Sequence, residues 1–394
     1  MEMTKTNPAY LSHSACALPS ARRLRSGGRR VRTTVTGARP RFVPPVPAAA
    51  GEHRRHSAAV GCAALLFGGL ASIGFGSPVM ALSTSGALSP AGPVPGTIFV
   101  ANAGGAGQGA GGTGPGSITL YRPGATGNAR PEAVITKGID GPGGFTLDTL
   151  GDLWVANESG KVVEYSRAEL ANASPVPTVT LSYGGGGLAF DPSGNLWVAN
   201  GSDVAELTKA AIARSGSPQP VRAFFDSCSV AFDPYGDLWE GSSSDTVAQL
   251  TEAQLATKFA LKWDKPLNTM IESLVPKVTI TWTSLNGPCK PAFDRSGDLW
   301  AGNYNSDTVV EFTKAELAKS GSPAPKVVIS SSQNGTPGDV AVDNSGDLWV
   351  PTMANSVVEY TKAQLTKSGS PAPALTIAGP ATKLNWPWAV TIEP

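Results

Sequence analysis

The stretch Gly151-Asp-Leu-Trp154-Val-Ala-Asn157 decides the fold, because the chain repeats it at regular intervals. The other copies, the last of them weaker, are Gly194-Asn-Leu-Trp197-Val-Ala-Asn200, Gly236-Asp-Leu-Trp239-Glu-Gly-Ser242, Gly297-Asp-Leu-Trp300-Ala-Gly-Asn303, Gly346-Asp-Leu-Trp349-Val-Pro-Thr352 and Gly96-Thr-Ile-Phe99-Val-Ala-Asn102. The tryptophans of the five strong copies lie 43, 42, 61 and 49 residues apart. A period of about 40–50 residues with several strands in each unit is typical of a β-propeller blade.

Each copy predicts one four-stranded blade. In the last full copy, short apolar segments at 340–343, 347–350, 356–360 and 374–377 are separated by turn residues. The first turn, Asp343-Asn-Ser-Gly346, suits a tight hairpin, because aspartate accepts backbone N–H groups and glycine adopts a positive φ. The tryptophan that follows is expected to pack its large apolar surface between neighbouring blades.

A second pattern recurs between the third and fourth strands. Ser or Thr is followed three residues later by Glu or Gln in four copies, as in Thr313 and Glu316, and the copy at Thr208 has alanine instead. This capping box predicts short helices, because it satisfies free N–H groups at a helix start. Lys-Ser-Gly-Ser-Pro follows at 319–323 and 367–371, where glycine and proline end the helix.

The two chain ends complete one another. The N-terminal fragment contains three expected strands, at 97–101, 117–121 and 133–135, and lacks a first strand. The chain ends with an isolated first-strand pattern at 388–393. Closing the ring with one C-terminal and three N-terminal strands leaves no open sheet edge. We therefore predict an all-β, six-bladed β-propeller over residues 96–394.

Composition supports this fold and disfavours nucleic acid as a partner. The chain has 46 glycines and 33 prolines, which favours many short strands, while 41% hydrophobic residues argue against disorder. Residues 1–56 hold 11 of the 31 basic and 2 of the 30 acidic residues, and 57–81 hold none. The remainder therefore carries 20 basic and 28 acidic groups, a net charge of −8. Binding to phosphates would need the opposite sign.

The first 81 residues have the order of a secretory signal. A basic leader (1–56) precedes an uncharged apolar run (57–75), and Val79 and Ala81 supply small residues before a cleavage site. A linker over 82–95 follows. We expect a protein of the cell envelope or the exterior, monomeric and free of the membrane after cleavage. A single membrane anchor is the alternative, and a start near Val43 would remove most of the leader.

The repeated Ala-Phe-Asp-x-x-Gly-Asp-Leu-Trp-Val-Ala-Asn resembles the six-bladed bacterial propellers of the NHL-repeat and virginiamycin B lyase-like kind. The resemblance implies the fold over about 96–394. It does not transfer the histidine- and metal-dependent lyase mechanism, because His13, His53 and His56 all lie in the leader. Gluconolactonase-like propellers instead imply a channel cluster of carboxylates and asparagines around a divalent cation.

One polar residue ends the second strand of every expected blade. These residues are Asn102, Asn157, Asn200, Ser242, Asn303 and Thr352. At the channel mouth such a ring could coordinate a cation or hold a polar ligand, or each side chain could close its own turn. Glu240 occupies a position that holds Val or Ala in the other copies. It is the candidate catalytic base, and with Asn200 and Asn303 the candidate ligand of calcium or another divalent cation.

Other residues break the repeat near the same face. Lys290 and Asp339 stand near the starts of first strands, and Tyr304 and Trp388 are aromatic groups suited to a sugar or another flat ligand. Cys228 and Cys289 occupy equivalent positions in adjacent blades, so a disulfide is a candidate. Two insertions interrupt the ring. Residues 103–116 are rich in glycine and alanine, and 256–277 are expected to replace a capped helix at the end opposite the mouth.

Two functions fit these observations. The first is an exported binding or scaffold module that holds a protein, glycan or small molecule through its channel face or the 256–277 insertion. The second is a divalent-cation-dependent lyase or lactonase-type hydrolase with a carboxylate and asparagine site in the channel. The absence of histidine from 57–394 and of any recognisable catalytic motif favours the first.

Overall fold

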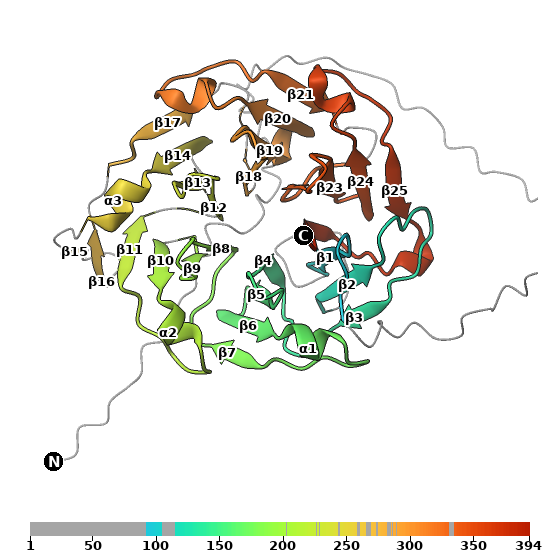
Figure 1. Ribbon diagram of the computed structural model, residues 1–394, viewed down its shortest axis with the longest axis horizontal. Coiled ribbons are helices and arrows are strands. Elements are labelled where there is room, and N and C mark those ends of the chain that lie inside the picture. Colours follow the sequence, from blue (N-terminus) through green and yellow to red (C-terminus); the bar gives the residue numbers. More distant parts are fainter. Residues whose placement is uncertain are drawn as a thin grey trace, which may run out of the picture. The chain divides into compact units, whose positions relative to one another are not determined.

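The chain forms a ring of six blades around a central axis (Figure 1). The computed structural model describes residues 92–104, 115–201, 203–225, 227, 229–242, 245–257, 261–264, 269–272, 275–281, 285, 287–288, 290–330 and 335–394. The predicted leader and signal region, most of the linker, and most of the 103–116 insertion lie outside these residues.

Each blade is a four-stranded antiparallel sheet whose first strand lies near the axis, as predicted. Blade 1 contains β26 (Pro387–Ile392), β1 (Ile98–Asn102), β2 (Ser117–Tyr121) and β3 (Ala133–Ile135); blade 2, β4 (Pro142–Leu147), β5 (Leu153–Asn157), β6 (Lys161–Tyr165) and β7 (Val179–Leu181); blade 3, β8 (Gly187–Phe190), β9 (Leu196–Ala199), β10 (Asp203–Leu207) and β11 (Arg222–Phe225); blade 4, β12 (Ser229–Phe232), β13 (Leu238–Ser242), β14 (Thr246–Leu250) and β17 (Val278–Thr281); blade 5, β18 (Ala292–Phe293), β19 (Leu299–Asn303), β20 (Thr308–Phe312) and β21 (Val327–Ser330); and blade 6, β22 (Ala341–Val342), β23 (Leu348–Thr352), β24 (Ser356–Tyr360) and β25 (Leu375–Ala378).

The ring closes as the sequence predicts. β26 pairs with β1, so the last strand of the chain completes the blade of the first three. Beyond the paired strands, the Gly96 N–H donates to the Glu393 carbonyl at 2.9 Å and the Glu393 N–H donates to the Thr97 carbonyl at 2.9 Å. Arg167 of blade 2 forms an ion pair with the Glu393 side chain. The two chain ends are therefore joined to each other and to the next blade.

The repeated Asp-x-x-Gly turn fixes the tryptophan behind it. In blade 4, Oδ1 of Asp233 accepts from the backbone N–H groups of Tyr235 and Asp237 at 2.9 and 3.0 Å. Its Oδ2 accepts from Nε1 of Trp239 at 3.0 Å. Gly236 has a φ of +85°, which favours glycine. One carboxylate thus closes the hairpin and orients the indole, which explains the fixed six-residue spacing from Asp to Trp.

The core lies between the blades. Each cluster of buried apolar side chains joins two neighbouring sheets, as where Trp154 of blade 2 lies in one cluster with Leu188 and Val198 of blade 3. The Trp154 ring meets Phe190 of that blade edge-on, with centroids 5.7 Å apart. This confirms the prediction that the repeated tryptophan packs against the next blade, where it removes a large apolar area from water.

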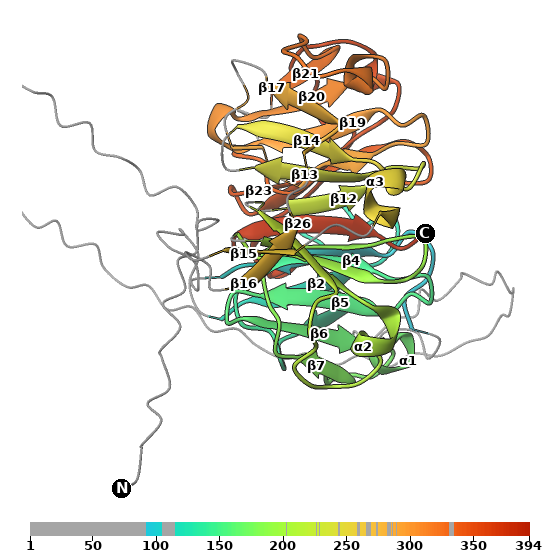
Figure 2. The same ribbon diagram turned by 90° about the vertical axis from the view of Figure 1, so that its left-hand side faces the viewer.

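Short helices follow the third strands and lie toward one end of the ring (Figure 2). They are single turns: α1 (Arg167–Leu170), α2 (Lys209–Ile212) and α3 (Glu252–Ala256), with 3-10 turns η2 (Glu316–Ala318) and η3 (Gln364–Thr366) in blades 5 and 6. Thr251 and Thr313 form complete capping boxes. In blade 2, one of the four copies with the predicted box, only half of it is formed: the Glu169 N–H donates to Oγ of Ser166, but the Glu169 carboxylate accepts from the Val176 N–H.

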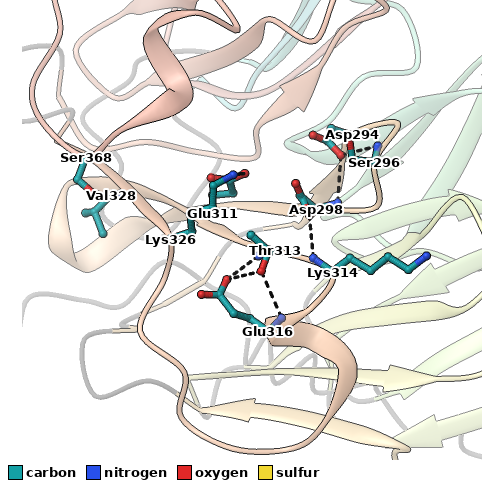
Figure 3. A network of polar contacts seen from close by, with 10 residues as sticks. All are labelled: Asp294, Ser296, Asp298, Glu311, Thr313, Lys314, Glu316, Lys326, Val328 and Ser368. Carbon is teal, nitrogen blue, oxygen red and sulfur yellow. Dashed lines mark hydrogen bonds and ion pairs between the residues drawn. The ribbon is translucent and has the colours of Figure 1, made fainter.

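The two Lys-Ser-Gly-Ser-Pro segments, at 319–323 and 367–371, join blades 5 and 6 to the blades before them. Oγ of Ser368 in blade 6 accepts from the Val328 N–H of β21 at 3.0 Å, and both residues are drawn in Figure 3. The following Gly369 forms a parallel bridge with Ile329 of the same strand. Ser320 with Gly321 makes the same contacts to β17. In blades 5 and 6 the segment that ends the helical turn therefore also contacts the outer edge of the preceding sheet.

The 256–277 insertion differs from its prediction in two ways. The capped helix α3 is kept, and the insertion follows it rather than replacing it. The insertion forms a hairpin of β15 (Leu261–Asp264) and β16 (Thr269–Glu272) on the outer rim beside β11 (Figure 1), away from α3 in Figure 2. It thus takes the place that the Ser-Gly segment occupies between other blades.

In the part of the chain that the structure describes, no helix has the length and apolarity to span a membrane.

Candidate functional site

The first strands surround the central axis of the ring, and one level along this axis carries polar side chains. In blades 2 to 6, the residue four positions before the first Asp of the Asp-x-x-Gly turn stands at the same level along the axis. Glu393 takes the place of this Asp in blade 1. Asp339 confirms this in blade 6, because it bridges Ala389 of β26. We call this level the tunnel ring, and its residues are Gly144, Gly187, Ser229, Lys290, Asp339 and Ala389. The polar members therefore come from the successive blades 4, 5 and 6.

Lys290 reaches across the tunnel. Its Nζ donates to the Leu188 carbonyl at 2.8 Å and lies 3.5 Å from the Phe145 carbonyl. These carbonyls belong to β8 and β4, in blades 3 and 2, whereas Lys290 precedes β18 of blade 5. Burial lowers the pKa of the Lys290 amine, and the charge of Asp339 opposes that effect. One side chain thus connects blades on opposite sides of the ring.

Asp339 is the carboxylate beside this lysine. It is 6% exposed, and its Oδ1 accepts from the Lys290 backbone N–H at 3.0 Å. Burial raises the pKa of Asp339 to about 6, while the Lys290 charge and this hydrogen bond act in the opposite direction. The carboxyl therefore changes charge near neutral pH, next to an amine whose pKa is lowered. Such a pair of perturbed groups is characteristic of functional sites.

Ser229 is a site residue that the sequence reasoning missed. It is 5% exposed, and its Oγ has no hydrogen-bond partner within the described part of the chain. A buried hydroxyl without a partner costs free energy, so this group is a ready donor or acceptor for a ligand. Its offset from the turn residue, the same as for Lys290 and Asp339, is the signal that could have found it.

Two aromatic groups from separate blades stand next to the tunnel ring, where the Asp339 N–H donates to the Trp388 carbonyl at 2.8 Å. Tyr304 starts the 3-10 turn η1 (Tyr304–Ser306) after β19, and Trp388 lies in β26. Their ring centroids are 5.6 Å apart at an interplanar angle of 53°. Gly338 packs against the backbone of Trp388, where a Cβ would stand 2.0 Å from the Trp388 carbonyl oxygen. We call Tyr304 and Trp388 the mouth pair; both rings are partly exposed.

Trp386, beside the mouth pair, has a strained backbone. Its φ of +57° is a true outlier for a bulky residue. The Trp386 N–H donates to Oδ1 of Asn355 at 2.7 Å, and its carbonyl accepts from the Ala103 N–H at 3.0 Å. Its buried Nε1 has no partner among the described residues. Strain of this kind concentrates at binding and catalytic sites, and no sequence pattern predicted it.

The predicted ring of polar residues is occupied by local hydrogen bonds. Asn102 accepts from the Asn385 N–H at 3.0 Å, so it holds the segment that leads into β26. Asn157 accepts from the Asp140 N–H at 2.8 Å and so holds the entry to β4 in the same way. These amides therefore position the first strands of their own blades.

The other ring residues also contact near neighbours. Asn200 donates to Oδ1 of Asp203 at 2.6 Å, Asn303 to Oγ1 of Thr308 at 3.1 Å, and the hydroxyl of Thr352 lies 2.8 Å from that of Ser356. Ser242 ends β13, and its side chain lies outside the described part. Ligand binding by this ring stays a prediction.

Glu240 lies in the middle of β13, opposite Val230 and Ala248, and is partly exposed. Its counterparts, such as Val155 and Val198, are fully buried apolar residues. Within the described residues, no group of three His, Cys, Asp or Glu side chains is placed to hold a metal ion. The roles of Glu240 as a base or a metal ligand stay predictions. Cys228 and Cys289 lie outside the described residues, so their pairing also stays a prediction.

No family model and no curated protein matches the chain. Among solved structures, it is similar to a catalytically inactive virginiamycin B lyase from Staphylococcus aureus with quinupristin, with 14% identity, a TM-score of 0.36, and coverage of 56% of this chain and 67% of that one. A streptogramin B lyase has 15% identity, a TM-score of 0.37, and coverage of 64% and 74%. A protein of unknown function from Bacteroides caccae has 10% identity, a TM-score of 0.47, and coverage of 74% and 97%. The likeness concerns the fold alone and carries no argument about activity.

Proposed function

We propose that this protein is an exported propeller that binds neutral glycans at the mouth of its tunnel. The observation that carries the proposal is the mouth pair, in which Tyr304 and Trp388 converge from blades 5 and 1 with centroids 5.6 Å apart. Partly exposed aromatic rings offer an apolar surface on which the C–H face of a sugar ring can pack. The Asp339 N–H donates to the Trp388 carbonyl, and apolar rings next to a few polar groups are the usual composition of a ligand site.

The polar groups below the mouth pair suit hydroxyl groups rather than a strongly charged ligand. Asp339 offers acceptor oxygens, Lys290 offers N–H donors, and Ser229 offers a hydroxyl without a partner in the described part. The Lys290 and Asp339 charges offset each other, so the site has no large excess of either sign. The propeller and its linker carry a net charge of −8, which disfavours polyanionic glycans.

The test is calorimetric titration of the full chain with a panel of neutral oligosaccharides. Trp388→Ala and Tyr304→Ala are each expected to weaken binding about tenfold, because each removes a stacking surface worth about 1–2 kcal/mol. Tyr235→Ala is the matched control. Tyr235 is an exposed aromatic residue in the turn of blade 4, at the other end of the strands, and its loss should not change binding.

Thermal unfolding of each variant separates lost binding from lost folding. Absence of binding to every neutral glycan in the wild-type protein would overturn the proposal. Equal affinities for the wild type and both mouth variants would do the same, because binding would then occur elsewhere.

A further inference from the structure

Four of the six blades have a short segment of the next blade on the outer edge of their last strand. The segment is a Ser-Gly or Thr-Gly pair whose glycine forms a parallel bridge with that strand. We call it the edge pair. The four edge pairs are Ser215-Gly216 on β7, Ser320-Gly321 on β17, Ser368-Gly369 on β21 and Thr126-Gly127 on β25. In blade 3, the β15–β16 hairpin lies beside β11 instead.

An edge pair satisfies the backbone groups that point out of the sheet. On β7, the Thr180 N–H donates to Oγ of Ser215 at 2.9 Å, and the Thr180 carbonyl accepts from the Gly216 N–H at 3.0 Å. The Ser182 N–H then donates to the Gly216 carbonyl at 2.7 Å. A sheet edge covered in this way offers no free row of N–H and C=O groups to another chain.

The outer strand of blade 1, β3, has the same outward groups without such a cover. Val134 stands opposite Thr119 of β2, as Thr180 of β7 stands opposite Val163 of β6. The N–H and carbonyl of Val134 and the N–H of Thr136 therefore point outward. In the part of the chain that the structure describes, nothing donates to this carbonyl or accepts from these N–H groups. Val134 is 41% exposed, so β3 is an open edge within these residues.

Blade 2, the neighbour on this side, has a different segment after its helix. Ala171-Asn-Ala-Ser-Pro175 follows α1, where Ala213-Arg-Ser-Gly-Ser-Pro218 follows α2. The Glu169 carboxylate holds the blade 2 segment, because it accepts from Nδ2 of Asn172 and from the Val176 N–H, both at 2.9 Å. The glycines of the three Ser-Gly pairs have a φ of +156° or +157°, which glycine adopts far more readily than other residues. A segment without glycine is therefore not suited to this contact.

The linker carries a Ser-Gly pair within reach of β3. Ser85-Gly86 lies six residues before Gly92, where the described chain begins. A Cβ on Gly92 would stand 3.8 Å from Cβ of Ala171, the C-cap of α1. In blade 3, the edge pair begins only two residues after the corresponding C-cap, Ala213. Six residues span up to about 20 Å, so the linker is long enough to continue from Gly92 to the edge of β3.

We propose that Ser85-Gly86 of the linker is the edge pair of blade 1. Oγ of Ser85 accepts from the Val134 N–H, the Gly86 N–H donates to the Val134 carbonyl, and the Gly86 carbonyl accepts from the Thr136 N–H. The linker thereby covers β3 and prevents another chain from adding a strand to it. The pair follows the predicted cleavage site at Ala81, so the mature protein keeps it.

This contact does not depend on glycan binding. The mouth pair lies in β26 and after β19, and neither residue belongs to β3. Failure of glycan binding and failure of this contact are therefore distinguishable.

The test is amide hydrogen exchange of the full chain, followed by mass spectrometry of the segments that contain β3 and β21. In the wild type, β3 is expected to be protected to the same degree as β21, which has an edge pair. Gly86→Val should speed exchange in β3 at least about fivefold, because the outward N–H groups lose their acceptors. A Cβ at the glycines of the three described Ser-Gly pairs would meet no atom within 4 Å, so the expected effect comes from the backbone conformation that valine resists rather than from a clash.

Gly27→Val is the matched control, because Ser26-Gly27 is the same pair in the leader. This variant should leave β3 unchanged, and β21 should be unchanged in every variant, which shows that the blades stay folded. Ser85→Ala should have a smaller effect than Gly86→Val, because it removes the acceptor of a single N–H group.

Three results would overturn the proposal. The first is equal exchange of β3 in the wild type and in Gly86→Val. The second is unprotected β3 in the wild type. The third is protection that rises with protein concentration together with a dimer in sedimentation, because a second copy would then cover the edge.

Discussion

Blades 2 and 4 have the same strands and turns, but they differ in the residue that the third strand places beside the aspartates of the turn. The third strand places Glu164 opposite Trp154 in blade 2 and Gln249 opposite Trp239 in blade 4. Nε2 of Gln249 donates to Oδ2 of Asp237 at 2.7 Å. The ionised carboxylate of Glu164 can only accept hydrogen bonds, so it has nothing to donate to its acidic neighbours.

The consequence for Glu164 is a raised pKa. The residue is 7% exposed, and burial, together with the charges of Asp152 and Asp148, raises the pKa of its carboxyl to about 7. A proton on Glu164 removes the repulsion between the carboxylates. The repeat therefore specifies the backbone and the packing of the tryptophan, while the charge balance of each blade depends on single residues.

In blade 5, a lysine compensates the charge of the buried carboxylate at this position. Glu311 stands opposite Trp300, and its Oε1 pairs with Lys326 at 3.1 Å, close to Asp298 and Asp294 in Figure 3. Burial raises the pKa of Glu311, and the hydrogen bond and charge of Lys326 oppose it. The position opposite the repeated tryptophan is thus a carboxyl group with a raised pKa in blade 2, an amide that donates to Asp237 in blade 4, and a carboxylate paired with a lysine in blade 5.

The largest expected effect comes from removing the cation of blade 5. Lys326→Met leaves Glu311, which is 3% exposed, as an unpaired buried carboxylate. We expect a loss of about 2–3 kcal/mol in the free energy of unfolding at pH 8; the half-exposed lysine keeps the loss below the full range for buried pairs. Urea unfolding measures it. Adding Glu311→Gln should recover most of the loss, and a variant as stable as wild type would contradict the account.

Glu164→Gln is expected to make blade 2 resemble blade 4. The folded-state pKa of Glu164, about 7, exceeds the ordinary value of 4.5, so ionisation destabilises the fold increasingly as the pH rises from 4.5 to 7. The variant should therefore be about 2 kcal/mol more stable than wild type at pH 8 and nearly equal to it at pH 4. Urea unfolding at both values is the measurement, and a difference that does not change with pH would refute the charge explanation.

Gln249→Glu is the reverse change and should have the smallest effect. It removes the donor to Asp237 and adds a charge, but the position is more exposed than that of Glu164. We expect a loss of about 1 kcal/mol in the free energy of unfolding at pH 8 that disappears toward pH 4. Thermal melts across this pH range would detect it. Equal melting temperatures at pH 8 would show that the amide of Gln249 contributes nothing.

Much of the frame follows from local sequence. The Asp-x-x-Gly turn, the strand pattern and the tryptophan at a fixed offset are short-range features, so the blades could be predicted from the repeats. Ring closure was also predictable, because a fragment of three strands and a single last strand complete one blade. Tyr304 and Trp388 were identified as aromatic groups of one face, although not as a contacting pair.

What the sequence by itself determined is therefore the propeller: its blades, their number and their closure. Only the tertiary structure decided that Lys290 reaches the carbonyls of Leu188 and Phe145, which lie 102 and 145 positions away in the chain. It also decided the strain at Trp386 and the place of the β15–β16 hairpin on the rim. The physical reason is distance along the chain: a turn or a cap forms among neighbouring residues, whereas the first strands meet around the axis only after the ring has closed.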